Sequence, residues 1–168
     1  VRAIPIYKPR GQYQKAEDIS NCVTVVVKAA SVNGYNYGLN DAYIENIRRY
    51  LENYRLVTTE VNIIPPRYIG ISVYCVVEVK PYYKDIKKVL EDFFTRELDA
   101  VNGKRAFGQN VDYGDIYGKI ESIDGVKRVI SLSLEPHGLE ILERSGGDIY
   151  IPPEGLTYLK SLELEVKE

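Results

Sequence analysis

The stretch from Ile69 to Lys80 constrains the fold of this chain more than any other part of the sequence. Its apolar residues recur at every second position, as Ile69, Ile71, Val73, Cys75, Val77 and Val79. A period of two held over this length predicts a β-strand with one buried face. The pattern also sets the register of pairing, because a shift by one residue would turn the whole apolar set toward water.

The residues before this strand predict a helix between two further strands. Asn40 is a good N-cap, and Ile44, Ile47 and Leu51 follow at helical spacing. The β-branched run at 23–27 is apolar on both faces, which is typical of a central strand. Residues 57–63 alternate and are stopped by Pro65 and Pro66, so a strand is expected there as well.

The residues after the long strand predict two more helices and two more strands. The segment 84–99 has an apolar stripe at helical spacing, and a shorter helix is expected over 112–123 with Asp112 as its N-cap. A strand is expected around 130–134 and a last one over 162–166, with a possible short strand at 149–151.

This order of elements favours an α+β fold with a ferredoxin-like βαββαβ core, an inserted third helix and a C-terminal β-hairpin extension. Such a core would place the strands at 23–27 and 69–79 side by side at its centre, and a generic α+β sandwich is the alternative. We expect residues 1–21 to be a lead-in segment or linker and residues 22–168 to be a single domain. The chain begins at Val1 and has no methionine, so a fragment of a longer parent chain is expected, although removal of an initiator methionine would also explain this start.

Charge and hydropathy exclude two classes of partner. The formal net charge is −2 and no basic run occurs, so nucleic acid is not an expected ligand. No apolar run approaches the roughly 20 residues of a membrane helix. Cys22 and Cys75 both lie in apolar strand patterns, which predicts buried free thiols.

The residue types that carry catalysis are scarce. The single histidine, His137, is expected in a surface loop, and one histidine with two separated cysteines cannot form a metal centre. Asp112, Asp115 and Asp124 lack the spacing of a calcium-binding EF-hand loop. The sequence therefore predicts no enzyme activity and no cofactor.

Tyrosine is the one residue type that points to a surface function. The chain has 15 Tyr, 3 Phe and no Trp, and tyrosine is enriched at protein interfaces. The candidates in loops and at helix flanks are Tyr35, Tyr37, Tyr82, Tyr83, Tyr113 and Tyr117, with Tyr158 nearby in the last part of the chain. Several of them are equally expected to be edges of the core.

Short motifs in a fixed order resemble the C-terminal region of baseplate J-like proteins of contractile phage tails. A helix leads into Arg55-Leu56, a strand, Pro66 and the alternating strand. Further matches are Phe107-Gly108 with Val111, the run from Ile123 to Val129, and the stretch from Ile151 to Leu162. The resemblance covers roughly residues 22–168, and family members are usually longer at the N-terminus.

The resemblance implies a non-enzymatic wedge component of a contractile tail baseplate, assembled in the bacterial cytoplasm and placed in the virion tail. Its implied partners are other baseplate and tail proteins, with a homo-oligomer as a further expectation, and neither nucleic acid nor membrane. The alternative is a small-molecule or saccharide-binding module in which the loop tyrosines stack on the ligand and Asp112 or Asp115 supplies polar contacts. That alternative requires several of these tyrosines around one pocket.

Overall fold

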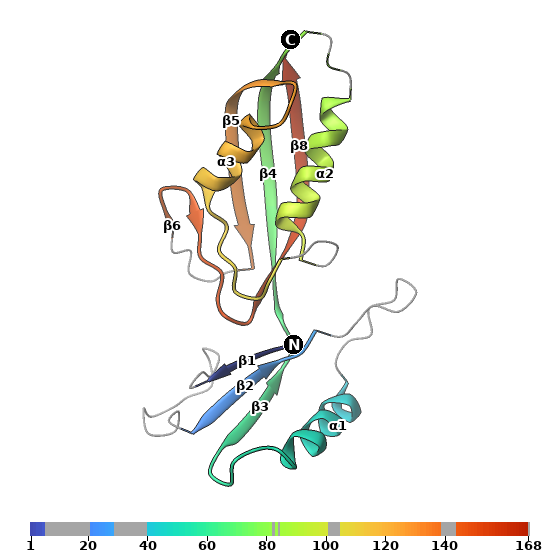
Figure 1. Cartoon of the computed structure of the whole chain (residues 1–168), viewed down its shortest axis with the longest axis vertical. Coiled ribbons are helices and arrows are strands. Elements are labelled where there is room, and N and C mark those ends of the chain that lie inside the picture. The colour runs from blue at the N-terminus through green and yellow to red at the C-terminus, as the bar shows by residue number, and fades with distance from the viewer. Residues whose placement is uncertain are drawn as a thin grey trace. The chain divides into compact units, whose positions relative to one another are not determined.

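A computed structural model describes residues 1–5, 21–28, 40–81, 83, 85–100, 105–138 and 144–167. The chain divides into two compact units, Val1–Arg67 (unit 1) and Tyr68–Glu168 (unit 2) (Figure 1). Each unit is described by itself. The division into a lead-in segment 1–21 and one domain 22–168 stays a prediction.

Unit 1 contains a three-stranded sheet of order β1-β2-β3, formed by Arg2–Pro5, Cys22–Val26 and Glu60–Ile64. β1 runs antiparallel to β2, and β3 runs parallel to it. The central position of β2 confirms the prediction from its apolar run. Pro5 lies on the edge strand β1, where a residue without an N–H group is tolerated.

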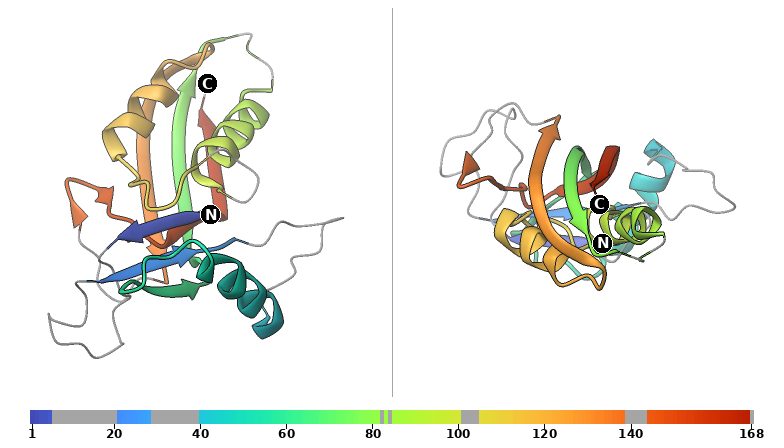
Figure 2. Two further views of the ribbon diagram at one scale, coloured as in Figure 1. Left: turned by 60° about the horizontal axis from the view of Figure 1, so that its bottom comes forward. Right: turned by 90° about the horizontal axis from the view of Figure 1, so that it is seen from above.

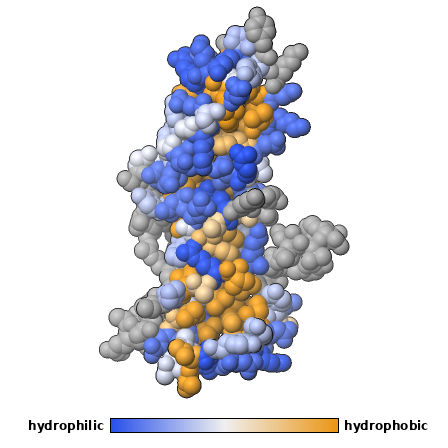
Figure 3. Space-filling view, in the orientation of Figure 1, coloured by the Kyte–Doolittle hydropathy of each residue, from blue (hydrophilic) through white to orange (hydrophobic). Residues whose placement is uncertain are grey.

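Helix α1, Asp41–Glu52, connects the parallel strands β2 and β3 of unit 1. The predicted N-cap is confirmed, because the Asn40 side chain accepts a hydrogen bond of 2.8 Å from the Tyr43 N–H. The small core of this unit consists of buried residues Val25, Val27 and Ile63, against which Ile44, Ile47 and Leu51 of α1 pack while staying partly exposed. Figure 3 accordingly shows apolar surface over the strands of this unit, drawn in the lower half of the view.

Unit 2 contains a second three-stranded sheet, of order β5-β4-β8. Its strands are Arg67–Val79 (β4), Val126–His137 (β5) and Gly155–Lys167 (β8). β5 runs antiparallel to β4, whereas Figure 1 shows β8 running in the same direction as β4. The alternation of β4 gives the predicted result, since Ile69, Ile71, Val73, Cys75, Val77 and Val79 are all buried in one core.

Two helices cover that apolar face, α2 (Ile86–Leu98) and α3 (Tyr113–Glu121). In the right view of Figure 2 both lie on the same side of the sheet. Their buried residues follow the predicted stripes: Ile86, Leu90, Phe93, Phe94 and Leu98 in α2, and Ile116 and Ile120 in α3. A hairpin of β6 (Arg144–Ser145) and β7 (Asp148–Ile149) adds Ile149 to the same core.

The opposite face of this sheet is polar. Ser72 and Tyr74 alternate with the buried residues of β4, and Ser131, Ser133 and Glu135 of β5 are exposed. Near one end of the two strands, Glu78 forms ion pairs with Lys127 and Arg128 of β5.

The α+β class with three helices is confirmed, but the predicted ferredoxin-like core is not. That core required β2 and β4 to be neighbours, and they belong to different sheets. The last strand does not form a C-terminal hairpin either, because β8 lies beside β4 as an edge of the main sheet. Alternation identified each strand correctly, but it contains no information on which strands pair.

Candidate functional site

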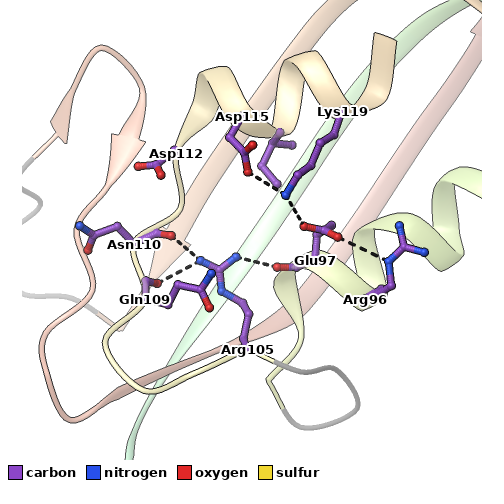
Figure 4. A pocket seen from close by; sticks show the side chains of 9 residues that line it. Arg96, Glu97, Arg105, Gln109, Asn110, Asp112, Asp115 and Lys119 are labelled. Carbon is purple, nitrogen blue, oxygen red and sulfur yellow. Dashed lines mark hydrogen bonds and ion pairs between the residues drawn. The ribbon is translucent and has the colours of Figure 1, made fainter. Parts of the chain in front are cut away.

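A polar pocket of about 260 Å³ lies in unit 2 between the end of α2 and the start of α3 (Figure 4). Arg105 connects the segments that line this pocket. The guanidinium donates to the backbone carbonyls of Glu97 at 2.6 Å, of Gln109 at 3.0 Å and of Asn110. Arg105 thereby ties the last turn of α2 to the loop that leads into α3.

Four of the charged side chains that line this pocket form ion pairs with one another. Lys119 lies 2.9 Å from a carboxylate oxygen of Glu97 and 2.8 Å from one of Asp115, and Arg96 lies 3.4 Å from Glu97. The hydrogen bond from Lys119 is the main cause that lowers the pKa of Glu97, and the bonds to Asp115 and Glu97 raise the pKa of Lys119. Burial lowers the pKa of Arg105.

The pKa of Glu97 is lowered by its hydrogen bond from Lys119, so this carboxylate is not poised to donate a proton near neutral pH. Within the described ranges, no three His, Cys, Asp or Glu side chains lie together as a metal site would require. The arrangement is a clamp between two helices.

The predicted tyrosines do not surround this pocket. Asp112 and Asp115 line it, but none of the nine residues that form its wall is a tyrosine. Tyr35, Tyr37 and Tyr82 lie outside the described residues. The stacking platform needed for saccharide binding is therefore not found at these aspartates among the residues that the structure describes.

Tyr113 and Tyr117 pack against the core of unit 2. Their rings are 6.1 Å apart, and their hydroxyls donate, each over 3.3 Å, to the backbone carbonyls of Leu132 and Val129 in β5. Tyr83 is 44% exposed, and its hydrogen bond with Asp124 raises its pKa. A role of these three residues at an interface stays a prediction.

His137 is not in a surface loop as expected. It is the last residue of β5, half-buried, and its Nε2 lies 2.9 Å from the Ser72 hydroxyl. The Ser161 hydroxyl donates to Ser72 at 2.8 Å, so the three side chains form a row across β5, β4 and β8. The turn-rich sequence after residue 137 and Pro136 itself predicted a loop here, but strand β5 continues through Pro136 to His137.

Unit 1 carries an exposed surface that the sequence did not single out. It consists of two groups of side chains, Tyr43, Tyr50 and Tyr54 on α1 and Leu56 and Val57 in the loop that follows the helix, and we name the two groups together the α1 surface. The three tyrosines are 49, 63 and 70% exposed, and the two aliphatic residues are 75 and 96% exposed. The rings of Tyr50 and Tyr54 are 5.2 Å apart. Exposed aromatic and aliphatic side chains are enriched at protein interaction sites.

The loop that presents Leu56 and Val57 is held in place by Arg55. Its Nε lies 2.5 Å from the Glu52 carboxylate, and one terminal nitrogen donates to the carbonyls of Val57 and Thr59 at 3.4 and 3.1 Å. The Thr59 N–H also donates to the Leu56 carbonyl at 2.9 Å. These bonds explain why β3 begins at Glu60 and not at residue 57, and they order the backbone that carries the two aliphatic side chains.

None of the helices in the described residues is long and apolar enough to cross a membrane. Both cysteines are free and buried, as predicted.

Comparison with known proteins finds a similar fold in a solved structure. No family model matches the sequence, and no curated protein matches it. Among solved structures, one chain of the cryo-EM structure of the anti-feeding prophage (AFP) baseplate is similar, with 13% sequence identity and a TM-score of 0.54 over 85% of the present chain. The present chain spans 29% of the length of that chain. At this identity the likeness shows a shared fold.

Proposed function

We propose that this chain is a non-enzymatic assembly module of a contractile tail baseplate, in a phage or a phage-derived injection machine. The observation that carries the proposal is the fold shared with a chain of the AFP baseplate over 85% of the present chain. Membership in the baseplate J-like family is part of the proposal, and the order of the short motifs supports it.

Two features of the described residues agree with an assembly role. Arg96, Glu97, Asp115 and Lys119 of the pocket are paired with one another, and the α1 surface exposes Leu56 and Val57 on a loop whose backbone is held by hydrogen bonds. A loop with an ordered backbone binds at a lower entropic cost than a mobile loop. We propose that the α1 surface contacts a neighbouring baseplate or tail protein and that the chain functions as part of the assembled particle.

Co-purification tests the proposal. The full-length protein that contains this chain is tagged and co-expressed with the tail proteins encoded beside it. The expected result is a stable complex with sheath, hub or neighbouring wedge proteins. Absence of any such complex, from a folded and soluble sample, contradicts the assembly role.

The α1 surface is tested with the double substitution L56D/V57D. Both side chains are largely exposed, so folding should be unaffected, whereas two charges would enter the apolar contact and weaken the complex by at least about tenfold. Lys87→Asp, an exposed charge change on α2, is the matched control and should leave binding unchanged. Equal binding by L56D/V57D and wild type would exclude this surface as the contact.

A further inference from the structure

The outer edge of β8 is covered over only part of its length. In its first residues, the N–H groups of Gly108 and Ala100 donate to the carbonyls of Gly155 and Thr157, both at 2.9 Å. From residue 159 to 167, no other described backbone segment outside the sheet bonds to the strand. At about 3.3 Å per residue, the described part of the chain leaves roughly 30 Å of this edge open.

The opposite edge of the same sheet receives hydrogen bonds from side chains. β5 is the opposite edge strand, and two of its carbonyls accept the hydroxyls of Tyr113 and Tyr117. Helix α3 thus supplies hydrogen bonds to β5 from its own side chains. An edge strand supplied in this way offers less to an incoming chain than a bare one.

The side chains of the open segment differ between its two faces. Leu162 and Leu164 pack on the core of unit 2 but are only partly buried, and Val166 is 39% exposed. Glu163 and Glu165 alternate with them and are exposed. The Tyr74 hydroxyl donates to Glu165 at 3.2 Å, which places these carboxylates on the polar face of the sheet.

The two glutamates have no ion-pair partner among the described side chains. Burial raises the pKa of Tyr74, and the charges of Glu165 and Glu163 raise it further, which agrees with two adjacent carboxylates on this face. Lys160 and Lys167 lie at either end of the segment. The middle of the edge is therefore acidic on one face and apolar on the other.

We propose that residues 159–167 of β8 bind an extended segment of a different polypeptide, which adds as a fourth strand to the β5-β4-β8 sheet. A row of unpaired backbone N–H and C=O groups is complemented by another strand. The side chains of the segment would alternate between apolar residues beside Leu162 and Leu164 and basic residues opposite Glu163 and Glu165.

A second copy of this chain fits the edge less well than such a segment. In a symmetric antiparallel pair centred on residue 163, 164 or 165, at least one glutamate stands directly opposite a glutamate. Like charges in directly opposed positions destabilise a strand pair. This inference rests on the proposed assembly role and adds to that role the chemistry of the partner segment. The following experiment measures only whether a strand adds to β8.

Hydrogen exchange of the 168-residue chain with synthetic peptides tests the inference. The first peptide is as long as the 159–167 segment, is blocked at both ends and alternates valine with lysine, and the second replaces every lysine with glutamate. A third is the lysine peptide with all of its backbone amides N-methylated, which keeps its charge but removes the backbone donors on both edges. The lysine peptide should slow exchange at 159–167 about tenfold and bind about tenfold more tightly than the glutamate peptide.

The double substitution E163K/E165K should reverse that preference. E91K/D92K, the same charge change on the exposed side of α2, is the control and should preserve it. Equal protection by the methylated peptide, no protection at 159–167 from the lysine peptide, or no reversal by E163K/E165K would overturn the inference. Protection of 159–167 that grows with protein concentration alone would overturn it in favour of a second copy. None of these results bears on co-purification with tail proteins.

Discussion

At the scale of single residues, the two cysteines illustrate how burial controls chemistry. Cys75 is fully buried in β4, and burial raises its pKa to about 11. Cys22 is 2% exposed in β2. Because the thiolate is the reactive form, a buried neutral thiol is inert.

We therefore expect neither thiol to react with iodoacetamide at pH 8 in the folded protein. Labelling followed by mass spectrometry should be at least about a hundredfold slower than that of free cysteine. In denaturing urea both sites should label at the rate of free cysteine, which is the internal control. Rapid labelling of Cys75 without denaturant would contradict its position in the core.

Glu97 gives a pH-dependent contribution to stability. Its hydrogen bond from Lys119 lowers its pKa below the ordinary value of 4.5. A lowered folded-state pKa stabilises the fold above the ordinary value, and this advantage is lost as the pH falls through the folded-state pKa.

The substitution E97Q should accordingly lower the free energy of unfolding by about 0.5 kcal/mol at pH 7. The difference from wild type should shrink as the pH falls below 4.5 and disappear below the folded-state pKa. Urea denaturation at a series of pH values measures this, with E91Q on the exposed side of α2 as control. A difference that persists at low pH would show that packing, and not charge, accounts for it.

At the scale of elements, two glycines of unit 2 are predicted to respond in opposite directions to alanine. Gly125 precedes β5 with φ of +100°, and a Cβ there would lie 2.5 Å from side-chain carbons of Ile86 and Tyr83. Gly114 lies in α3, where a Cβ would meet nothing within 4 Å. The first position needs glycine, whereas the second only weakens a helix.

G125A should lower the free energy of unfolding by more than about 1 kcal/mol. G114A should raise it by up to about 1 kcal/mol, because alanine favours the helical state. Chemical denaturation of both variants against wild type measures the pair. Destabilisation by G114A would mean that the start of α3 has a constraint beyond helix propensity.

The elements themselves could be predicted from the sequence because their signals are local. The alternation of β4, the stripes of α1, α2 and α3 and the Asn40 cap all depend on neighbours within a few residues. The division into two sheets and the place of β8 beside β4 depend on contacts between distant parts of the chain. The ordering of the 55–59 loop was missed for a related reason, since one arginine and two backbone carbonyls create it.

At the scale of the whole molecule, the two units differ in the size of their cores. In unit 2 the long strand β4 is the central strand of its sheet and contributes six buried residues to a core shared with β5, α2 and α3. The core of unit 1 is limited to Val25, Val27 and Ile63 with partly exposed neighbours. Larger apolar burial gives greater resistance to opening.

Native-state hydrogen exchange should therefore find the slowest amides in β4. The amides of β2 and β3 should exchange at least about tenfold faster. Wild type under increasing, sub-denaturing urea gives the measurement, and the solvent-facing amides of α1 give the fast reference. Equal protection in both sheets would mean that the units open together.

The candidate site was less accessible to sequence reasoning than the fold. The excess of tyrosine predicts a surface role, which stays a prediction, and composition cannot show which rings are exposed. The hydroxyls of Tyr113 and Tyr117 donate hydrogen bonds to β5, whereas the side chains of Tyr50 and Tyr54 are exposed to water. The helical spacing of residues 43, 50 and 54 contains the signal, although it is hard to separate from an ordinary core stripe.

The exposed Tyr50–Tyr54 ring pair also has an optical consequence. The chain contains no tryptophan, so Tyr54→Trp would place a single indole on the α1 surface, at a side chain that is 70% exposed. Its emission should be that of a hydrated indole in the free protein and should move to shorter wavelength when a partner covers the surface. Tyr83→Trp, made as a separate variant, is the reference in unit 2. Comparing the emission shifts of the two variants would report which of the two units a neighbouring protein touches, and the time course of the shift would give the rate of binding.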